Sequence, residues 1–199
     1  MTPCPQCHLS FQCICAQLPQ CSSQLQLALL THENEFTRET NTGHWLAQSL
    51  PHCHRYRWSR VSPPEDLLQQ LANPNVTPYL IFPSEMSVDI GTQWQSSAHC
   101  PSQVLFIILD GTWQEARKMW RQSPWLHTLP QVHITPNQES IYKLRRNQDS
   151  GHLCTLEVGC ELLKAVGESH HAQALHQFFA YSMQAFHADK SGHALQQEK

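Results

Sequence analysis

Two short stretches of the sequence combine residue types that can do chemistry. The first runs Leu109-Asp110-Gly111-Thr112-Trp113-Gln114-Glu115-Ala116-Arg117-Lys118-Met119-Trp120 and places a carboxylate just before a glycine. The second is the N-terminal order Cys4-Pro5-Gln6-Cys7, five residues, then Cys13-Ile14-Cys15. A carboxylate held at the end of a strand can accept a proton, and two thiolate pairs can hold a tetrahedral metal ion.

Asp110 follows an uninterrupted apolar run, residues 104–109, which predicts a strand buried on both faces. Thr112 and Glu115 have the spacing of a capping box, so a helix is expected to begin after Gly111. Asp110 should therefore lie at the carboxyl end of a central strand, where ligands bind in open α/β sheets. The alternative is that Asp-Gly only forms a turn. That alternative is weakened because a carboxylate next to a buried strand costs free energy of desolvation, and a turn alone does not offset that cost.

The helix expected after Gly111 is two-faced. Trp113, Ala116 and Trp120 recur at the spacing of a core-facing stripe. A polar and basic stripe lies on the other side and comprises Gln114, Arg117, Lys118 and Arg121.

Structural zinc is the preferred interpretation of the two N-terminal cysteine pairs. They can close a tetrahedral site, and a segment too short for its own core needs such a staple. His8 could replace one ligand, and Cys21 is a spare. The alternatives are a redox-active Cys-x-x-Cys or unligated thiols, but no strand-helix unit surrounds the pair. Four thiolates leave no open coordination position, so a catalytic zinc is not expected.

Length and composition predict one globular domain with a small appendage. The chain has 199 residues, of which 40% are hydrophobic and 15% charged. We expect a cysteine-rich segment at 1–22 and an α/β domain at 23–199. No apolar stretch reaches the roughly 18 residues of a membrane span, and the N-terminus does not resemble a secretory signal. With an odd count of 9 cysteines, these features predict a cytoplasmic protein with no membrane partner.

Strand-like and helix-like segments alternate along the chain, which predicts a mainly parallel sheet with helices on both faces. Strands are expected at 25–30, 56–61, 79–82, 104–109 and 131–135. Helices are expected from 43 to 50, 65 to 71, about 153 to 167 and 172 to 187, besides the one after Gly111. Residues 86–103 look irregular. The sequence lacks the glycine-rich motifs of dinucleotide enzymes and nucleoside triphosphatases and the nucleophile elbow of serine hydrolases.

The net charge of −3 argues weakly against nucleic-acid binding, because such domains are usually basic. The cations are nevertheless clustered, and a basic patch can coexist with a negative total. One group contains Arg38, Arg55, Arg57 and Arg60, and the other contains Arg117, Lys118, Arg121, Lys143, Arg145 and Arg146.

Several motifs together resemble those of the DTW-domain family of tRNA-uridine aminocarboxypropyltransferases. In chain order they are the cysteine pairs, Thr40-Asn41-Thr42-Gly43, Pro83-Ser84-Glu85, the Asp110-Gly111-Thr112-Trp113 block with Gln114 and 116–119, and Leu153-Cys154-Thr155-Leu156-Glu157. The resemblance covers about residues 4–180. Thr31-His32 is followed by Glu33-Asn34-Glu35 where many relatives have a proline and a basic residue, so the role of the loop at 32–39 is not given by the resemblance.

The resemblance implies a SPOUT-related fold with a C-terminal trefoil knot that forms a pocket for S-adenosylmethionine (SAM). The implied reaction moves the 3-amino-3-carboxypropyl group of SAM to N3 of an unpaired uridine in the tRNA variable loop and releases methylthioadenosine. No obligate protein partner is implied. The cofactor-binding residues that it implies are Phe82, Pro83, Ser84, Leu109, Gly111, Thr112, Trp113, Leu153, Cys154, Thr155 and Glu157.

Asp110 is our candidate catalytic residue. Uridine N3 becomes a nucleophile only when its proton leaves, and a carboxylate can take that proton or orient the reactants. A carboxylate beside the cationic sulfonium would also favour SAM binding, but it would then be a weaker base. N3 lies on the Watson–Crick edge, so the uridine must be unpaired or flipped out.

Other residues have two readings each. Trp113 or Tyr142 could stack on the base, although Trp113 could equally pack in the core. Cys154 could be a nucleophile, but a small buried side chain is the simpler reading. Phosphate contacts are expected from Arg38, Arg117, Arg145 and Arg146, with a solvated surface as the alternative. Two rival functions remain: a SAM-dependent RNA methyltransferase and a non-catalytic, zinc-stapled RNA-binding module.

Overall fold

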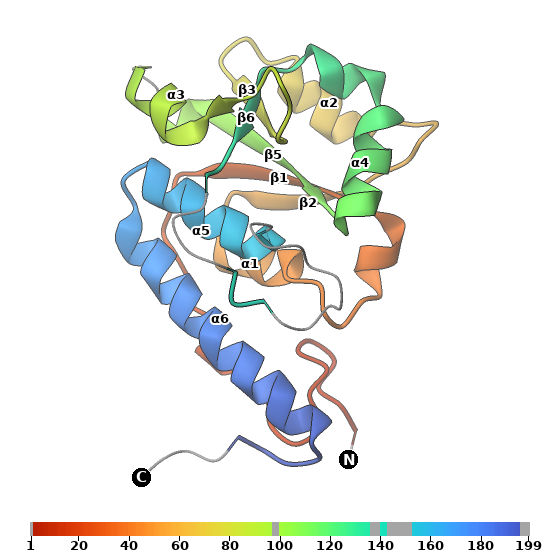
Figure 1. Ribbon diagram of the computed structural model, residues 1–199, viewed down its shortest axis with the longest axis vertical. Coiled ribbons are helices and arrows are strands. Elements are labelled where there is room, and N and C mark those ends of the chain that lie inside the picture. The colour runs from red at the N-terminus through yellow and green to blue at the C-terminus, as the bar shows by residue number, and fades with distance from the viewer. Residues whose placement is uncertain (1, 97–99, 136–139, 143–152, 196–199) are drawn as a thin grey trace.

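A six-stranded parallel sheet in the order β2-β1-β5-β3-β6-β4 forms the centre of the molecule (Figure 1). The computed structural model describes residues 2–96, 100–135, 140–142 and 153–195. The strands are β1 (Gln26–Thr31), β2 (Cys53–Arg57), β3 (Thr77–Ile81), β4 (Val88–Asp89), β5 (Val104–Asp110) and β6 (Gln131–His133). The helices are α1 (Gly43–Ser49), α2 (Glu65–Leu71), α3 (Ile90–Ser96), α4 (Trp113–Arg121), α5 (Thr155–Ala165) and α6 (Ser169–Lys190), with short 3₁₀ helices at Cys15–Gln17, Glu33–Phe36, Pro101–Gln103 and Pro124–Thr128.

The central strand β5 is buried on both faces, as its apolar run predicts. It lies between β1 and β3, and all seven of its residues are buried. Its side chains alternate between two cores: Val104, Phe106 and Ile108 face one, and Leu105, Ile107 and Leu109 face the other. Burial of each such side chain stabilises the fold by about 1.5–3 kcal/mol. The strand is therefore a rigid base for the residue that ends it.

Helices cover both faces of the sheet, which confirms the predicted α/β layering. Helices α1, α3, α5 and α6 contribute to one core, and α2, α4 and the turn Pro124–Thr128 contribute to the other (Figure 1). Among the described residues, no helix has the length and apolar character needed to cross a lipid bilayer. The expected C-terminal knot depends on the path of residues 136–152, most of which lie outside the described ranges, so it stays a prediction.

The strand expected at 56–61 is wrong in position. The observed β2 begins at Cys53, which pairs with Leu27, and it ends at Arg57. Trp58 then leaves the sheet, and its indole N–H donates to Ser123 Oγ at 2.9 Å. The polar residues of 52–57 hid this strand in the sequence. It lies at the edge of the sheet, and an edge strand needs apolar side chains only where it packs against the core.

The irregular conformation expected for 86–103 is also wrong. This region holds β4, α3 and the turn Pro101–Gln103. Helix α3 begins beside Asp89, whose Oδ1 accepts from the Gly91 amide at 2.9 Å. On α4, the buried residues are Ala116 and Met119, while Trp113 and Trp120 are only half-buried, so the expected core stripe is rotated. Helix α6 is longer than the expected 172–187, because it begins at Ser169.

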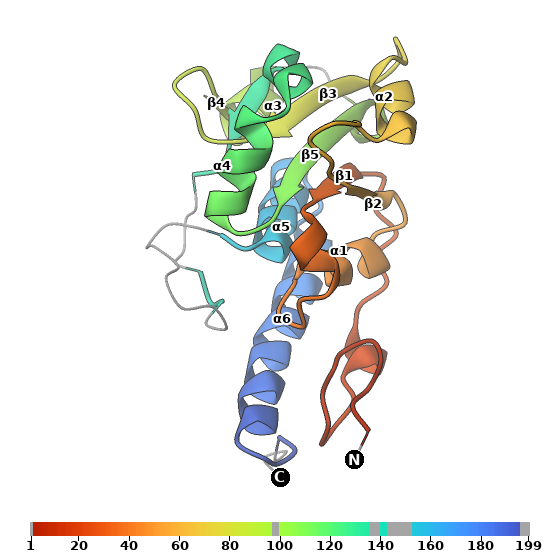
Figure 2. The ribbon, with the colours of Figure 1, turned by 90° about the vertical axis from the view of Figure 1, so that its right-hand side faces the viewer.

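The N-terminal segment lies beside the far end of α6 (Figure 2). Asp189 Oδ1 accepts hydrogen bonds from the amides of Ser10 at 2.7 Å and Phe11 at 2.9 Å. Cys7 and Ile14 are fully buried in the same core as α6. The first and last parts of the described chain are thus packed together.

Candidate functional site

A cavity of about 590 Å³ lies at the carboxyl ends of β3, β5 and β6. Segments that are distant in the sequence form its wall: residues within 35–42, 81–83, 108–117, 133–134, 142 and 153–158 all contribute. The position at strand ends agrees with the strand-end argument. The residues expected from the resemblance that line it are Phe82, Pro83, Leu109, Gly111, Thr112, Trp113, Leu153, Cys154 and Thr155. Ser84 and Glu157, expected in the same set, are not among its described lining residues.

Asp110 ends β5 at this cavity and is 1% exposed. Its Oδ1 accepts from the Thr155 hydroxyl at 2.8 Å, and its Oδ2 accepts from the Thr31 hydroxyl at 3.1 Å. Asn41 Nδ2 lies 3.1 and 3.2 Å from the two oxygens. A guanidinium nitrogen of Arg55 stands 3.7 Å from Oδ2. The carboxylate is therefore held in one orientation, mostly by neutral donors.

Burial raises the pKa of Asp110, because the charged form is poorly solvated there. The nearby charge of Glu35 raises the pKa further. The Thr155 hydroxyl, Arg55 and Asn41 act in the opposite direction, but the net shift is upward. Asp110 thus binds a proton more tightly than an ordinary aspartate, which suits a group that must accept one.

Gly43, the first residue of α1, lets that helix approach Asp110. A Cβ at this position would lie 2.8 Å from both carboxylate oxygens, closer than real Cβ contacts. A side chain here would have to move a carboxylate that several donors hold. The Thr40-Asn41-Thr42-Gly43 motif therefore serves the site through the Asn41 amide and through this lack of a side chain.

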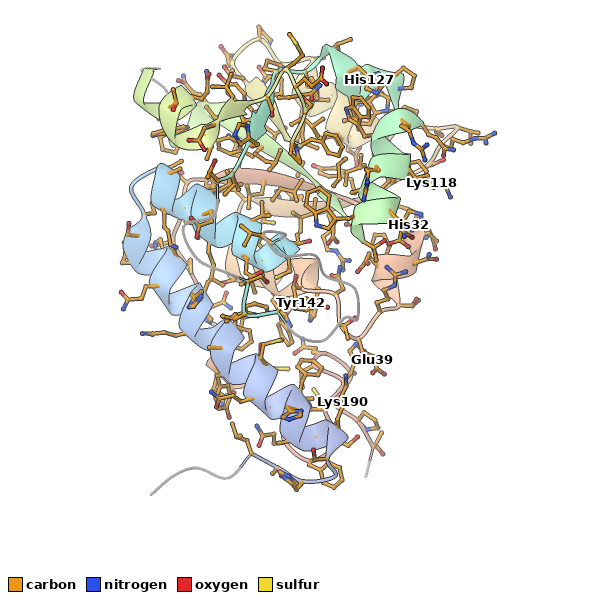
Figure 3. All side chains as sticks on the ribbon, in the orientation of Figure 1. His32, Glu39, Lys118, His127, Tyr142 and Lys190 are labelled. Carbon is orange, nitrogen blue, oxygen red and sulfur yellow. The ribbon has the colours of Figure 1, made fainter. Side chains whose placement is uncertain are left out.

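The loop at 32–39 supports the site from behind. Glu35 is 1% exposed, and its Oε2 accepts from Asn41 Nδ2 at 2.8 Å. Arg38 forms ion pairs with Glu35 and with Glu115, whose oxygens accept at 2.7 and 2.8 Å. Figure 3 labels His32 and Glu39 on either side of this loop. The loop thus contacts both Asn41, which holds Asp110, and Glu115 at the start of α4.

Glu115 has the capping role predicted from its spacing to Thr112. The Glu115 amide donates to Thr112 Oγ1 at 3.2 Å, and the Thr112 amide donates to Glu115 Oε2 at 2.9 Å. These two bonds close a capping box at the start of α4. Burial opposes ionisation of Glu115, but hydrogen bonds from Arg38 and from the Thr112 amide outweigh it and hold its pKa well below the usual range. Glu115 is thus a permanent anion that orders the turn.

Glu157 organises the wall formed by α5. Its Oε2 accepts from the Cys154 amide at 2.9 Å and from Ser140 Oγ at 2.6 Å, and its Oε1 accepts from the Ile141 amide at 2.8 Å. Cys154 is half-buried, and the desolvation of its thiol raises the pKa well above the usual range. Such a thiol stays protonated near neutral pH, which agrees with a packing role. Ser84 shapes the turn after β3, where its hydroxyl accepts from the Met86 amide.

The residues expected to contact RNA lie in different surroundings. Arg117 is exposed and lines the cavity, while the guanidinium of Arg38 is engaged by two carboxylates. Trp113 is half-buried at the cavity wall. Tyr142 is buried, stacks on Phe179 and donates its hydroxyl hydrogen bond to the Thr40 carbonyl (labelled in Figure 3). Arg145 and Arg146 lie outside the described residues.

The paired N-terminal cysteines converge as their spacing predicts. The sulfur atoms of Cys4, Cys7, Cys13 and Cys15 all lie within 4.8 Å of one another. The Cys4–Cys13 and Cys4–Cys15 distances are 3.6 and 3.7 Å. A tetrahedral zinc with Zn–S bonds of about 2.3 Å requires sulfur separations of about 3.8 Å, so the four side chains fit that ion. Cys21 lies apart, against Ser49, and is not part of the cluster.

Sequence reasoning missed two important residues of the site, Glu35 and Asn41. Both lie in the strand-end loop after β1, and the polar character of that loop was the available signal. Their partners are distant in the chain, since Asn41 and Asp110 are 69 residues apart. His133, the last residue of β6, and Ile134, which follows it, also line the cavity and were not expected there.

Comparison with known proteins gives a family match and a curated relative. The family model described as the DTW domain matches residues 1–187. The chain is 30% identical over 164 residues to tRNA-uridine aminocarboxypropyltransferase 2 of Drosophila melanogaster. That match covers 79% of this chain and 62% of the relative, so the chain spans less than two thirds of its length. No solved structure matches the chain significantly.

Proposed function

This chain belongs to the DTW-domain family, and on that premise we propose that it is a tRNA-uridine aminocarboxypropyltransferase. The proposed reaction transfers the 3-amino-3-carboxypropyl group of SAM to N3 of an unpaired uridine in the tRNA variable loop. Methylthioadenosine is the second product. The name of the Drosophila relative supports the class of reaction.

The observation that carries the proposal is the position of Asp110. It ends the central strand at the wall of the cavity and is held by four side chains, one each from β1, the turn before α1, β2 and the start of α5. The cavity volume of about 590 Å³ is within the usual range for small-molecule sites, about 300–1,000 Å³, and suits a donor the size of SAM. The lining residues from the turns after β3 and β5 and from the start of α5 would hold it.

In the proposed mechanism, Asp110 receives the N3 proton through Thr155. Both residues line the cavity, but Asp110 is only 1% exposed, whereas Thr155 is half-buried and donates to Asp110 Oδ1. The Thr155 hydroxyl is therefore the group that meets the base in this proposal. The N3 proton moves to Thr155 Oγ as the hydroxyl proton of Thr155 moves to Asp110. N3 then bonds to the γ-carbon of the donor, whose C–S bond breaks with its electron pair left on sulfur.

Selection of the γ-carbon rather than the methyl group is geometric in this proposal. Both carbons are bound to the same sulfonium, so the cavity must place the γ-carbon in line with N3 and turn the methyl group away. The cavity lining includes Phe82 and Leu109, which are apolar and suit a methyl group. Asp110 also supplies a negative charge near the sulfonium.

The cysteine cluster is proposed as a structural zinc site. The zinc would tie residues 1–22 into one unit against α6, and residues 23–199 would form the SAM-binding domain with a SPOUT-like knot. Four thiolates give the ion no open position, so no chemical step uses it. Metal analysis of the purified protein should find about one zinc per chain, and Cys4→Ser with Cys7→Ser should remove it. A metal-free protein of unchanged stability would contradict the proposal.

The reaction is tested by incubating the protein with SAM and unmodified tRNA, followed by mass spectrometry of the nucleosides. We expect aminocarboxypropyluridine and an equal amount of methylthioadenosine. Methylated nucleosides with S-adenosylhomocysteine would instead identify a methyltransferase. Binding of tRNA without any modification would identify a non-catalytic RNA-binding module.

A further inference from the structure

A second hollow, the outer groove, continues from the cavity along α4. It has a volume of about 490 Å³ and is lined by Phe82, Pro83, Gln114, Arg117, Trp120 and Arg121. Phe82, Pro83, Gln114 and Arg117 also line the cavity, so the two hollows adjoin. A ligand chain that leaves the cavity on this side therefore meets the outer groove next.

The charge at the outer groove is positive. All four exposed side chains of α4 lie on one face, and three of them, Arg117, Lys118 and Arg121, are cations. The acid of this helix, Glu115, points to Arg38 on the other side of the turn. The protein as a whole has a formal charge of −3, so this concentration of cations is local.

Phe82 and Trp120 line the outer groove and form an aromatic ladder with His127, which lies just beyond the lining residues. Phe82 stacks on Trp120 with ring centroids 5.2 Å apart, and Trp120 contacts the ring of His127 at 4.4 Å. His127 is exposed at the outer end and its Nε2 lies 2.8 Å from the Trp120 carbonyl. The ladder thus runs from the cavity to the surface, where His127 presents a ring to solvent. Exposed aromatic rings beside arginines suit a single nucleic-acid strand.

We propose that the outer groove holds the RNA strand adjoining the target uridine. This inference rests on the proposed function, because a uridine placed in the cavity must stay covalently joined to its neighbours. Arg117 and Arg121 contact the phosphates of those neighbours, and His127 offers its ring to one of their bases. Contacts of this kind position the strand without reading its sequence.

Arg121 is the best residue for a test because it lines the outer groove and not the cavity. Lys190 provides a matched control, since it is an exposed cation near the end of α6, far from the labelled Lys118 on α4 (Figure 3). Arg121→Glu and Lys190→Glu make the same change in charge. Arg121→Lys keeps the positive charge but loses the planar guanidinium, which can bind a phosphate through two nitrogens.

Binding of unmodified tRNA is measured without SAM at several salt concentrations. We expect Arg121→Glu to weaken binding about tenfold and to reduce the slope of log K against log salt by about 1, because one phosphate contact is lost. Arg121→Lys should restore most of the affinity, and Lys190→Glu should match the wild type. With SAM present, the loss should appear as a raised KM for tRNA, while SAM binding stays unchanged.

The proposal is overturned if Arg121→Glu binds tRNA with wild-type affinity and salt dependence, or if Lys190→Glu weakens binding equally. The first result would show that the outer groove does not hold RNA, and the second that only total charge matters. Because binding is measured without SAM, these results are independent of catalysis. A wild-type protein that binds tRNA through Arg121 but transfers nothing would refute the proposed function alone.

Discussion

Asp110 and Glu115 lie at the two ends of one turn, yet their surroundings have opposite effects on their protons. Burial raises the pKa of both carboxyls, and at Asp110 the neighbouring Glu35 adds to the rise. At Glu115 the Arg38 guanidinium and the Thr112 amide reverse it. The Arg38 contact fixes Glu115 as a structural anion, whereas the donors and Arg55 around Asp110 do not outweigh burial and the charge of Glu35, so its affinity for protons stays raised.

This contrast assigns separate tasks to two ends of the same turn. The Glu115 end is an ordered support, tied to the loop at 32–39 and to the start of α4. The Asp110 end carries a carboxylate with a raised pKa, which can take up a proton and is held by Thr31, Asn41 and Thr155. Variants that affect only one end should therefore separate catalysis from stability.

The largest effect should come from Asp110→Asn. The amide keeps the shape of the side chain but cannot take a proton, so transfer should fall by about 10²- to 10⁴-fold. Release of methylthioadenosine measures the rate, and circular dichroism checks the fold. Glu115→Gln is the matched control, with a lower melting temperature and a much smaller loss of rate. If the two variants lost equal activity, the division of tasks would be refuted.

Two glycines give the next contrast. A Cβ on Gly159 would lie 2.5 Å from Leu46 Cδ1 in the core, so Gly159→Ala should cost about 1–3 kcal/mol of stability and little activity. A Cβ on Gly43 would instead press on the Asp110 carboxylate. Gly43→Ala should therefore lower the transfer rate more than Gly159→Ala does, and it should lower the free energy of unfolding less. Denaturant unfolding and initial rates of both variants decide the matter, and the reverse ranking would contradict it.

Arg38→Gln should weaken the support without touching the cavity. The change removes the ion pairs with Glu35 and Glu115, and it leaves the buried Glu35 without its cation. Because Arg38 is 31% exposed, water will offset part of the loss, and we expect about 1–2 kcal/mol. Urea unfolding measures this cost. Arg57→Gln, which removes an exposed pair with Glu33, is the control and should cost little.

The smallest effect should be a difference in pH dependence. The folded-state pKa of Glu115 is lowered, so its contribution to stability is present above its ordinary value of 4.5 and is lost as the pH falls below it. The folded-state pKa of Asp110 is raised, so its contribution is present below its ordinary value of 3.8 and is lost as the pH rises through the folded-state pKa. Unfolding free energies between pH 3 and 7, compared with Glu115→Gln and Asp110→Asn, should show slopes of opposite sign. Equal slopes would contradict the shifts.

Features encoded by neighbouring residues could be predicted from the sequence. The burial of β5 follows from its apolar run, and the start of α4 follows from the spacing of Thr112 and Glu115. The convergence of the four cysteines follows from their pairing in the chain. In each case the signal extends over no more than about a dozen residues.

Features that depend on distant contacts could not be predicted. The ion pair of Arg38 with Glu115 joins residues 77 apart, and no local pattern indicates it. The same holds for β2, whose place is set by pairing with β1 rather than by its own composition. The role of the loop at 32–39 emerges only when the strands bring these residues together.

The hydrogen bonds from Ser10 and Phe11 to Asp189 span 179 and 178 residues. During synthesis the cysteine segment leaves the ribosome before the sheet exists, yet its docking partner on α6 emerges after every strand. The segment that is made early must therefore wait, exposed, until the rest of the domain has formed. A metal ion acquired during that interval would shield four reactive thiols until the last helix arrives.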